Sequence, residues 1–563
     1  MDITQWYAIG LSGLVGLYVV TFALITISKK IIPRVKLLFL LVLAGLMKIG
    51  TYAKRRFLQH VYYPQTHRYL RGSEKITRFD LLVTITFLVG VVVCTVIQVQ
   101  NIPGLRRRSG LISIINIIPL SLGAHMNLLA NVCGIRLGAY GRIHRWLGRV
   151  AIVEGLIHTA TAVSLKRPNW HMLPDIGGLT ATISIVLMLL SSLARIRQRF
   201  YEVFHKLHLI FSTTLIAALF IHGQSKDLLT PPTVYLLAVI CLQILTGALR
   251  FGQILYRNIK YGKPLNRATV QTVTFKRDSG RDIPVSDAVH VHVRLSRPWR
   301  PRAGQYAYLC IPGLSHTSFA QSHPFYVAWW YYDHGHDHVV FLIERREGFT
   351  KNLFLRANAS NDPGPNSEMR VLVEGPYGKS LNLESYATVL LFATGIGIAG
   401  QMPYVTQLLE GSQTGQVETR RIALFWEMAS ELHAAWVADM MKVLLAKDTN
   451  RVLDIKLFVV GRFLSPHTHK GDIAQLGERI KVIYQAMDVE NLIHSEVGDR
   501  QGRTVVSLCT DDETSDTIRG IVRGMLEQDV HLEELDFRPA SSRKGEMARD
   551  ITVTRSKRKV SGI

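Results

Sequence analysis

The sequence predicts a multi-domain membrane protein, in which an α-helical transmembrane bundle is followed by an antiparallel β-barrel and a Rossmann-like α/β domain. Apolar runs of membrane-spanning length fill the first 255 residues. Short strands separated by turn residues occupy 262–385, and strands alternate with helices from 386 onward. The change of pattern therefore divides the chain into a membrane half and a soluble half.

Seven apolar runs in the first half are each long enough to span the hydrocarbon of a bilayer. They lie at 6–27, 80–100, 110–132, 142–164, 177–194, 203–222 and 233–251. An eighth run, 37–47, is too short to span and predicts an interfacial segment. The N-terminus has neither a basic n-region nor a cleavage site. We therefore expect 1–79 to be a signal-anchor helix followed by a basic cytosolic segment.

The net charge of +24 has its source in basic clusters between the predicted spans. By the positive-inside rule, the clusters in 29–78, 142–149 and 195–199 place the N-terminus outside and everything after 251 in the cytosol. Arg106, Arg107 and Arg108 then lie in a predicted outer loop, 101–110, against the rule. Topology explains the charge, so we expect no nucleic-acid partner. The five cysteines form no CxxC pair, so neither a disulfide framework nor a zinc site is indicated.

Four histidines form two pairs of identical spacing in the apolar runs. His144 and His158 are fourteen residues apart, and so are His208 and His222. Fourteen residues return to nearly the same helix face, roughly 21 Å further along the axis. Two such helices side by side would present one imidazole pair near each membrane face, which is the arrangement that holds two b-type haems. The alternative is that each histidine only hydrogen-bonds a neighbouring helix.

Other histidines fit this geometry less well. His205 lies roughly 100° off the face of His222, which favours an interfacial position near a haem propionate. His125 has no histidine fourteen residues on, which favours a packed polar residue. The cluster His334-Gly-His336-Asp-His338 could bind a metal, but a hairpin tip favours a solvated turn.

A GxGxxG sequence opens the last domain. Gly395, Gly397 and Gly400 follow a predicted strand directly and precede a predicted helix. Glycines there allow a pyrophosphate to approach the helix N-terminus, although they could equally shape a strand–helix turn alone. Three arginines are candidates to bind the 2′-phosphate that NADPH carries and NADH lacks, so NADPH is favoured. They are Arg420, Arg421 and Arg451.

From about residue 80 to 538 the chain resembles the fungal ferric reductases, which are FAD- and NADPH-dependent transmembrane metalloreductases related to NADPH oxidases. In the membrane half, the resemblance rests on His144-Arg-Trp-Leu-Gly-Arg149 leading to His158, and on Phe204-His-Lys-Leu-His208 leading to His222. It implies a six-helix domain over 80–255 that binds two haem b groups through these four histidines.

The barrel carries the flavin motifs of this family. Gly304-Gln305-Tyr306 and His323-Pro324-Phe325 resemble its flavin-binding strands, although Tyr326 stands where the family usually has Thr or Ser. Gly348-Phe349-Thr350 resembles the loop that approaches the FAD pyrophosphate. The resemblance implies that 262–385 binds FAD through His323, Pro324, Phe325, Tyr326, Gly348, Phe349 and Thr350.

The nucleotide motifs continue to residue 538. Gly375-Pro-Tyr-Gly378 resembles the turn between the two soluble domains, and the GxGxxG resembles the NADPH loop. The family's Cys-Gly-Pro element appears as Cys509-Thr510-Asp511, and a basic tail, 539–563, which we expect to be disordered, follows Phe537. The implied NADPH-binding residues are Gly375, Gly378, Gly395, Gly397, Gly400, Arg420, Arg421 and Cys509.

The resemblance implies an NADPH-dependent ferric-chelate reductase of the plasma membrane. Electrons would pass from cytosolic NADPH through FAD and two haems to ferric or cupric chelates outside, in support of reductive iron uptake with a ferroxidase and permease system downstream. The cofactors supply the redox chemistry, so no catalytic side chain is assigned. Two alternatives stay open: a superoxide-generating NADPH oxidase, and a catalytically degenerate membrane protein, which Tyr326 and the altered Cys509 element would permit.

Overall fold

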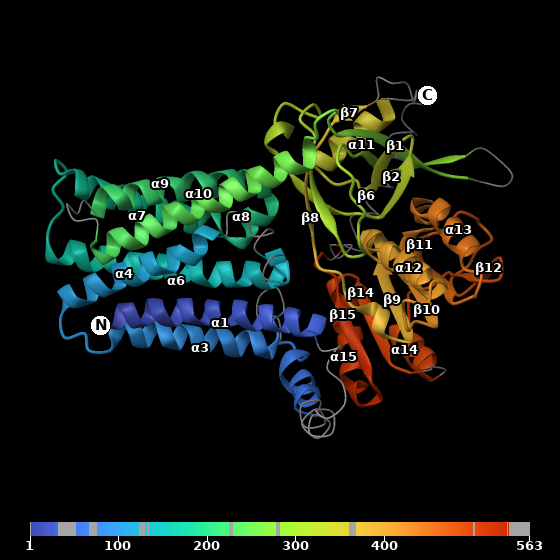
Figure 1. Ribbon diagram of the computed structural model, residues 1–563, viewed down its shortest axis with the longest axis horizontal. Coiled ribbons are helices and arrows are strands. Elements are labelled where there is room, and N and C mark those ends of the chain that lie inside the picture. Colours follow the sequence, from blue (N-terminus) through green and yellow to red (C-terminus); the bar gives the residue numbers. More distant parts are fainter. Residues whose placement is uncertain are drawn as a thin grey trace, which may run out of the picture. The chain divides into compact units, whose positions relative to one another are not determined.

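The computed structural model describes residues 2–31, 52–66, 76–122, 130–131, 134–223, 229–276, 282–359, 368–498, 502–537 and 539. The chain forms two compact units (Figure 1). The first comprises Met1–Lys54 and Gln65–Leu255, and the second comprises Arg55–Pro64 and Tyr256–Ile563. The predicted interfacial segment 37–47, His125 and nearly all of the basic tail lie outside the described residues.

Each of the seven predicted spans overlaps a long helix. The helices are α1 (Ile3–Ile31), α3 (Arg78–Val96), α4 (Ile102–Ser121), α6 (Leu137–Leu165), α7 (Leu173–Ser191), α9 (Tyr201–Gly223) and α10 (Pro231–Asn258), with a short α8 (Ala194–Arg199) between α7 and α9. In the described part of the chain, α3, α7, α9 and α10 are long and apolar enough to cross a membrane. Together with the three sheets described below, these helices confirm the predicted fold class.

The predicted loop at 101–110 is wrong. Asn101 caps α4 by accepting the backbone N–H of Gly104 at 2.8 Å, so Arg106, Arg107 and Arg108 lie in the first two turns of that helix. Asparagine followed by a proline in the first turn is a strong helix start. The prediction from apolar runs began the helix too late, because three arginines interrupt the apolar pattern.

Small residues allow α4 and α6 to approach each other closely. The Ser113 hydroxyl on α4 donates to the carbonyl of Ala151 on α6 at 2.8 Å. A Cβ at Gly155 would lie 3.3 Å from Ser113 Oγ and 3.0 Å from Ile185 of α7. Serine, alanine and glycine at such contacts are typical of helices that pack inside a membrane.

The second unit begins with two antiparallel sheets of strand order β5-β6-β2-β1-β7 and β4-β3-β8. Their elements are β1 (Arg267–Phe275), β2 (Ile283–Arg294), β3 (Tyr306–Cys310), β4 (His323–Tyr326), β5 (Trp329–Asp333), β6 (His336–Glu344), α11 (Phe349–Ala359), β7 (Met369–Arg370) and β8 (Leu372–Tyr377). Alternate residues of β2, Val289, Val291 and Val293, enter a core that also contains Leu309 and Phe341. This period of two is the alternation expected of a strand with one buried face.

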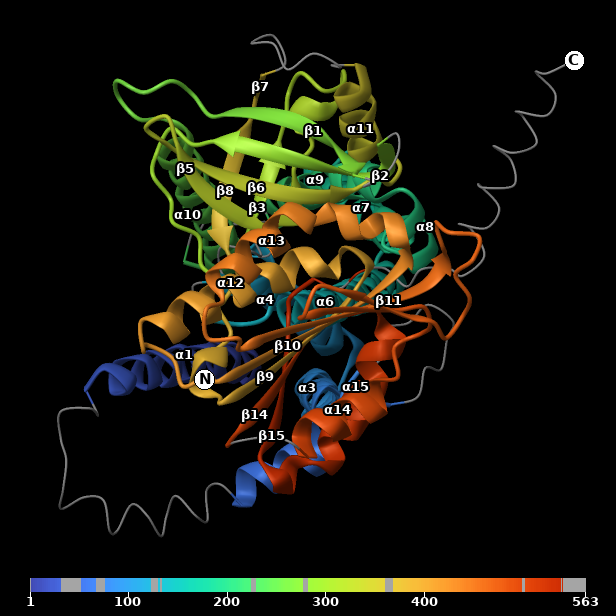
Figure 2. The same ribbon diagram turned by 90° about the vertical axis from the view of Figure 1, so that its right-hand side faces the viewer.

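A seven-stranded sheet of order β12-β13-β11-β10-β9-β14-β15 follows (Figure 2). Neighbouring strands are parallel except β12 and β13. The elements are β9 (Thr388–Thr394), α12 (Ile398–Gln413), β10 (Arg421–Ser430), α13 (Ala438–Lys447), β11 (Leu453–Arg462), β12 (Ile473–Leu476), β13 (Ile480–Ile483), α14 (Val489–Gly498), β14 (Thr504–Cys509), α15 (Asp512–Gly524) and β15 (Val530–Glu534). Before α13, Glu431–Trp436 forms a 3-10 turn.

The central strand β9 is buried along its whole length because helices cover both faces of the sheet. Val389 and Leu391 belong to the core that contains residues of α12 and α13. Leu390 and Phe392 belong to the opposite core, which contains residues of α14 and α15. A strand buried on both faces is the mark of a doubly wound parallel sheet, and it explains the unbroken apolar run before Gly395.

Part of the predicted N-terminal cytosolic segment packs with the second unit. Arg55–Pro64 includes a short π-helix, Leu58–Tyr62, and Tyr63 is only 7% exposed. Tyr63 joins the same core as Phe392 and Ile518, and burial raises the pKa of its phenol above the ordinary value. This segment is therefore anchored to the seven-stranded sheet by a buried aromatic side chain.

One buried carboxylate ties strands β10 and β11 to α14. Glu496 is 4% exposed, and it accepts hydrogen bonds from Arg421 at 2.6 Å and from Lys456 at 3.1 Å. Burial by itself would raise the pKa of Glu496, but these cations outweigh it and hold the pKa below its usual value. Such a carboxylate stabilises the fold above its unfolded pKa of about 4.3, and that stability is lost as pH falls through the lower folded pKa.

We expect Glu496→Gln to lower the free energy of unfolding by about 1–3 kcal/mol at neutral pH, because charge-assisted hydrogen bonds are lost. The difference from the unsubstituted chain should narrow below about pH 4. Thermal unfolding of the purified full chain, followed by tryptophan fluorescence, measures it. The control is Glu478→Gln, whose ion pair with Arg451 is 74% exposed on both sides and should contribute little. An equal loss in both variants, or a loss independent of pH, would contradict the assignment.

Candidate functional site

The four histidines of the sequence pattern form two imidazole pairs between α6 and α9. The ring centroids of His144 and His208 are 6.2 Å apart, and those of His158 and His222 are 6.0 Å apart. Two imidazoles on opposite sides of one metal, with about 2 Å from metal to nitrogen and about 1 Å from nitrogen to ring centre, place their centroids about 6 Å apart. Each pair could therefore hold one metal ion between its two rings.

Backbone carbonyls orient the rings of the second pair. His158 Nδ1 lies 2.8 Å from the carbonyl oxygen of Arg106, and His222 Nδ1 lies 2.7 Å from that of Pro174. A carbonyl only accepts, so each Nδ1 must carry the proton and donate it. The lone pair is then on Nε2, the nitrogen left to bind a metal, as in metal-bound histidines generally.

Two glycines make these contacts possible, and the sequence analysis missed both. A Cβ at Gly110 would lie 2.6 Å from His158 Nδ1, and one at Gly178 would lie 2.9 Å from His222 Nδ1. Each glycine follows the accepting carbonyl by four residues, on α4 and on α7. In a helix that carbonyl already bonds the N–H four residues on, so a glycine there exposes its second lone pair. A glycine in an apolar run on a helix that neighbours a histidine helix was the available signal.

The first pair is held differently. His208 Nδ1 is buried, and no hydrogen-bond partner for it is found among the described residues. Its ring packs 5.5 Å from that of Phe204. His205 stacks on Tyr201 at 6.3 Å with 27° between the planes, so it lies outside both pairs.

The flavin motifs meet at the start of α11. The ring of Phe349 lies 4.5 Å from that of His323 on β4 and 6.4 Å from that of Phe325. Gly348 has φ +76°, a backbone conformation that favours glycine, and the Thr350 hydroxyl accepts the N–H of Arg346 at 2.7 Å. A glycine turn that opens a helix presents free N–H groups, which suits a pyrophosphate.

Tyr326 faces the nucleotide-binding domain. It pairs with Tyr306 in the β3–β4 ladder, and its phenol oxygen accepts the backbone N–H of Phe537 at 2.9 Å. A Cβ at Gly400 would lie 3.2 Å from Tyr326 Cδ2. Burial, and then the neighbouring Cys509 thiol, raises the pKa of Tyr326 well above its ordinary value, so the phenol is neutral.

The three glycines of the GxGxxG loop have different roles. Gly395 has φ +47° and makes the turn out of β9. A Cβ at Gly397 would lie 1.9 Å from the carbonyl oxygen of Cys509, and one at Gly400 would lie 2.6 Å from Leu535 Cδ2. The second and third glycines therefore allow α12 to begin directly against the ends of β14 and β15.

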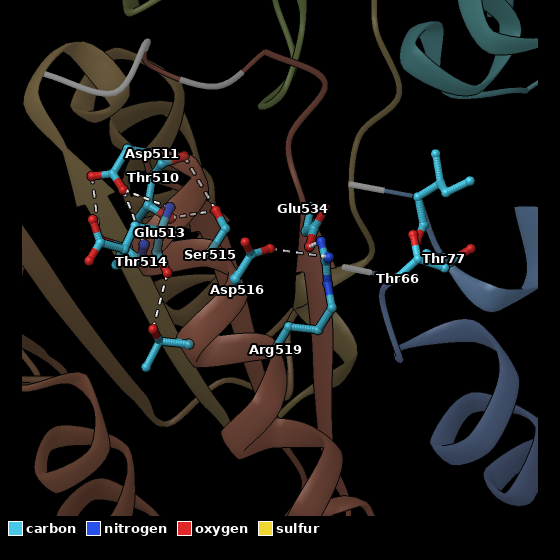
Figure 3. Close-up of polar contacts among 12 residues, drawn as sticks. Thr66, Thr77, Thr510, Asp511, Glu513, Thr514, Ser515, Asp516, Arg519 and Glu534 are labelled. Atoms are coloured by element: carbon cyan, nitrogen blue, oxygen red, sulfur yellow. Dashed lines mark hydrogen bonds and ion pairs between the residues drawn. The ribbon is translucent and has the colours of Figure 1, made fainter. Parts of the chain in front are cut away.

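Cys509-Thr510-Asp511 replaces the family's Cys-Gly-Pro with a helix cap (Figure 3). Asp511 accepts the backbone N–H groups of Glu513 and Thr514 at 3.0 and 3.1 Å and so starts α15. Its own N–H donates to Thr394, the residue before the glycine loop, at 2.8 Å. This element therefore holds the ends of β9 and β14 together without a glycine.

Gly375 and Gly378 lie at the end of β8. The Gly375 carbonyl accepts the Nε–H of Arg257 at 3.2 Å, and a Cβ at Gly378 would lie 2.5 Å from the Gly304 carbonyl oxygen. Both have positive φ, at +140° and +92°. They allow β8 to approach β3 closely, which is the role that the structure shows for them.

The assignment of Arg420 and Arg421 to a 2′-phosphate is corrected by the strand register. Arg421 pairs with Thr388 at the start of β9, whereas the glycine loop follows Thr394 at its end. Six residues of strand separate these positions by about 20 Å. Arg421 is engaged with Glu496, and Arg451, before β11, pairs with Glu478. Nucleotides bind outside the carboxyl ends of such strands, and these arginines lie at the opposite edge.

The histidine cluster 334–338 forms the β5–β6 hairpin turn. His334 is 93% exposed in its side chain, and His338 stacks on Tyr331 with 5° between the ring planes. Among the described residues, no group of three or more His, Cys, Asp or Glu side chains is placed to hold a metal.

Three family models match the chain in the order of its parts. "Ferric reductase like transmembrane component" matches residues 109–219, "FAD-binding domain" matches 275–381, and "Ferric reductase NAD binding domain" matches 386–522. The first contains three of the four paired histidines, His144, His158 and His208, and ends three residues before His222. The other two contain the flavin motifs and the glycine loop.

The chain is also similar to two fungal proteins and to one solved structure. Ferric reductase transmembrane component 3 of Saccharomyces cerevisiae is 28% identical over 54% of this chain and 40% of its own length. Probable cell surface ferric reductase kap2 of Aspergillus oryzae is 24% identical over 65% of this chain and 48% of its own. The chain thus spans less than half the length of both. Ferredoxin-NADP+ reductase from Plasmodium falciparum with 2'P-AMP overlaps 48% of this chain and 95% of that chain, with 11% identity and a TM-score of 0.30.

The three matched models, each over the part of the chain whose motifs had suggested it, show that this protein belongs to the ferric reductase family, with a transmembrane component, an FAD-binding domain and an NAD-binding domain.

Proposed function

We propose that this chain carries electrons from NADPH, through FAD and two b-type haems, across a membrane to a ferric chelate on the other side. The observation that carries the proposal is the pair of imidazole–imidazole separations, 6.2 and 6.0 Å, at which each pair of histidines could hold one haem iron. When bound, FAD supplies the conversion of a hydride into single electrons, and the haem irons supply one-electron carriers.

The residues of the chain would divide this work by position. His144 and His208 would hold one haem, and His158 and His222 the other, with Nε2 of the latter pair presented by the carbonyl contacts described above. The turn before α11 and the GxGxxG loop would bind the pyrophosphates of FAD and NADPH at two helix N-termini. The protein thus supplies placement and ligands rather than a reacting side chain.

Three observations support the direction of transfer and the acceptor. The basic clusters favour a cytosolic position for the nucleotide domain, with the His158–His222 pair near the outer face. Four described helices can span a membrane. Both fungal relatives are named as ferric reductases, and one as a probable cell surface ferric reductase. A role in reductive iron uptake at the plasma membrane, beside a ferroxidase and permease system, follows as part of this proposal.

The proposal is tested with purified full-length chain in vesicles that enclose a ferric chelate and a ferrous indicator. NADPH added outside should reduce the enclosed iron, and the unsubstituted chain should contain about two haems b. His158→Ala should keep about one haem and abolish the reduction, whereas His205→Ala should retain both haems and the activity. If superoxide dismutase suppressed the NADPH-dependent reduction of a redox dye, the chain would instead be an oxidase that forms superoxide. Absence of haem from the unsubstituted chain would show a degenerate protein.

We expect Gly110→Ala to weaken haem binding at the His158–His222 pair, because the added Cβ would lie 2.6 Å from His158 Nδ1 and turn the ring away from its carbonyl. The haem absorbance per chain should fall toward half. The matched control is Gly90→Ala on α3, where a Cβ would meet nothing within 4 Å. Unchanged haem content in Gly110→Ala would refute the role of this glycine.

We expect the double substitution of Arg420 and Arg421 by alanine to change KM for NADPH and for NADH by the same factor. Only NADPH carries the 2′-phosphate, and these arginines lie at the opposite edge of the sheet from the glycine loop. Steady-state kinetics with both nucleotides measure the two KM values. A selective rise for NADPH would show that the 2′-phosphate reaches these arginines and that the correction is wrong.

A further inference from the structure

Both backbone polar groups of Phe537 are held by side chains from two different domains. Its N–H donates to the phenol oxygen of Tyr326, at the end of barrel strand β4, at 2.9 Å. Its carbonyl accepts the thiol of Cys509, at the end of β14, with 3.5 Å between sulfur and oxygen. Phe537 is therefore anchored on the barrel side and on the nucleotide side at once.

The Phe537 ring lies between aromatic rings of the two flavin-motif strands. Its centroid is 4.6 Å from that of Tyr306 at an interplanar angle of 81°, and 5.4 Å from that of Tyr326 at 72°. Both are edge-to-face contacts, which aromatic pairs prefer. The ring is therefore fixed against the barrel face that carries these motifs.

The anchoring residues also border the glycine loop. A Cβ at Gly400 would lie 3.2 Å from Tyr326 Cδ2 and 3.2 Å from Cys509 Sγ. A Cβ at Gly397 would lie 3.1 Å from Cγ of Pro539, two residues beyond Phe537. A dinucleotide whose pyrophosphate occupied this loop would therefore lie beside the residues that anchor Phe537.

We propose that Tyr326 is a positioning residue that latches Phe537 in the path of the nicotinamide, so that NADPH enters by displacing Phe537. The inference rests on the proposed binding of FAD and NADPH. It also explains the tyrosine in a strand where the family usually has threonine or serine. A phenol oxygen extends several ångströms further from the backbone than a threonine hydroxyl, and that length lets it reach the Phe537 amide.

Tyr326→Phe removes the latch and keeps the ring. Displacing Phe537 then costs one hydrogen bond less, so NADP+ should bind about two- to tenfold more tightly, the range that corresponds to one net hydrogen bond. KM for NADPH should fall, and kcat should fall or stay constant, because tighter binding does not speed product release. FAD content should stay the same, since the aromatic contacts of the strand remain.

The experiment uses the full-length purified chain loaded with FAD, titrated with NADP+ and followed by the absorbance of the bound flavin. The matched control is Tyr404→Phe, whose phenol also accepts a backbone N–H, that of Leu381, at 3.0 Å. Tyr404→Phe should leave NADP+ affinity unchanged. In a Phe537→Ala background, Tyr326→Phe should add little, because no ring remains to be displaced.

Unchanged NADP+ affinity in Tyr326→Phe, or an equal change in Tyr404→Phe, would overturn the latch. Loss of FAD from Tyr326→Phe would overturn it too, because the hydroxyl would then serve the flavin. These failures leave the proposed function intact when the unsubstituted chain still binds NADP+ and FAD. If the unsubstituted chain binds neither, the proposed function fails, and the latch fails with it.

Discussion

The membrane unit depends on two contacts in which an imidazole Nδ1 donates to a helix carbonyl. A helix carbonyl is already bonded to the N–H four residues on, and its second lone pair is reachable only where no Cβ covers it. Gly110 and Gly178 provide that opening on α4 and α7 for His158 and His222. These contacts commit Nδ1 of each ring to the carbonyl, and Nε2 is left available to a metal.

In the second unit, the glycine loop and Cys509 lie at the carboxyl-terminal edge of the parallel strands. The glycine loop follows β9, and Cys509 ends the neighbouring β14. Asp511 joins the two strand ends through Thr394 while it caps α15. This edge therefore combines the ends of β9 and β14 with the cap of α15, and the glycine loop offers a helix N-terminus to a pyrophosphate.

Tyr326 and Phe537 show how the barrel and the nucleotide domain share one site. The barrel supplies the phenol, and the chain after β15 supplies the amide that it accepts. Cys509 completes the contact from the nucleotide side. Two residues that depart from the family's pattern, Tyr326 and Asp511, thus have contacts within this chain that explain them, which weakens the argument that they mark a degenerate protein.

Local pattern in the sequence was sufficient to predict the apolar helices, the order of the domains, the GxGxxG turn and the pairing of the four histidines. Hydropathy, strand alternation and helical periodicity depend only on near neighbours along the chain. Register and close approach were decided by the tertiary structure. Arg421 was misassigned because sequence spacing does not tell which edge of a sheet a residue occupies. The hydrogen bonds of His158 and His222 to helix carbonyls, and that of Tyr326 to Phe537, join partners 48 to 211 residues apart. Such partners are brought together only when the whole chain has packed.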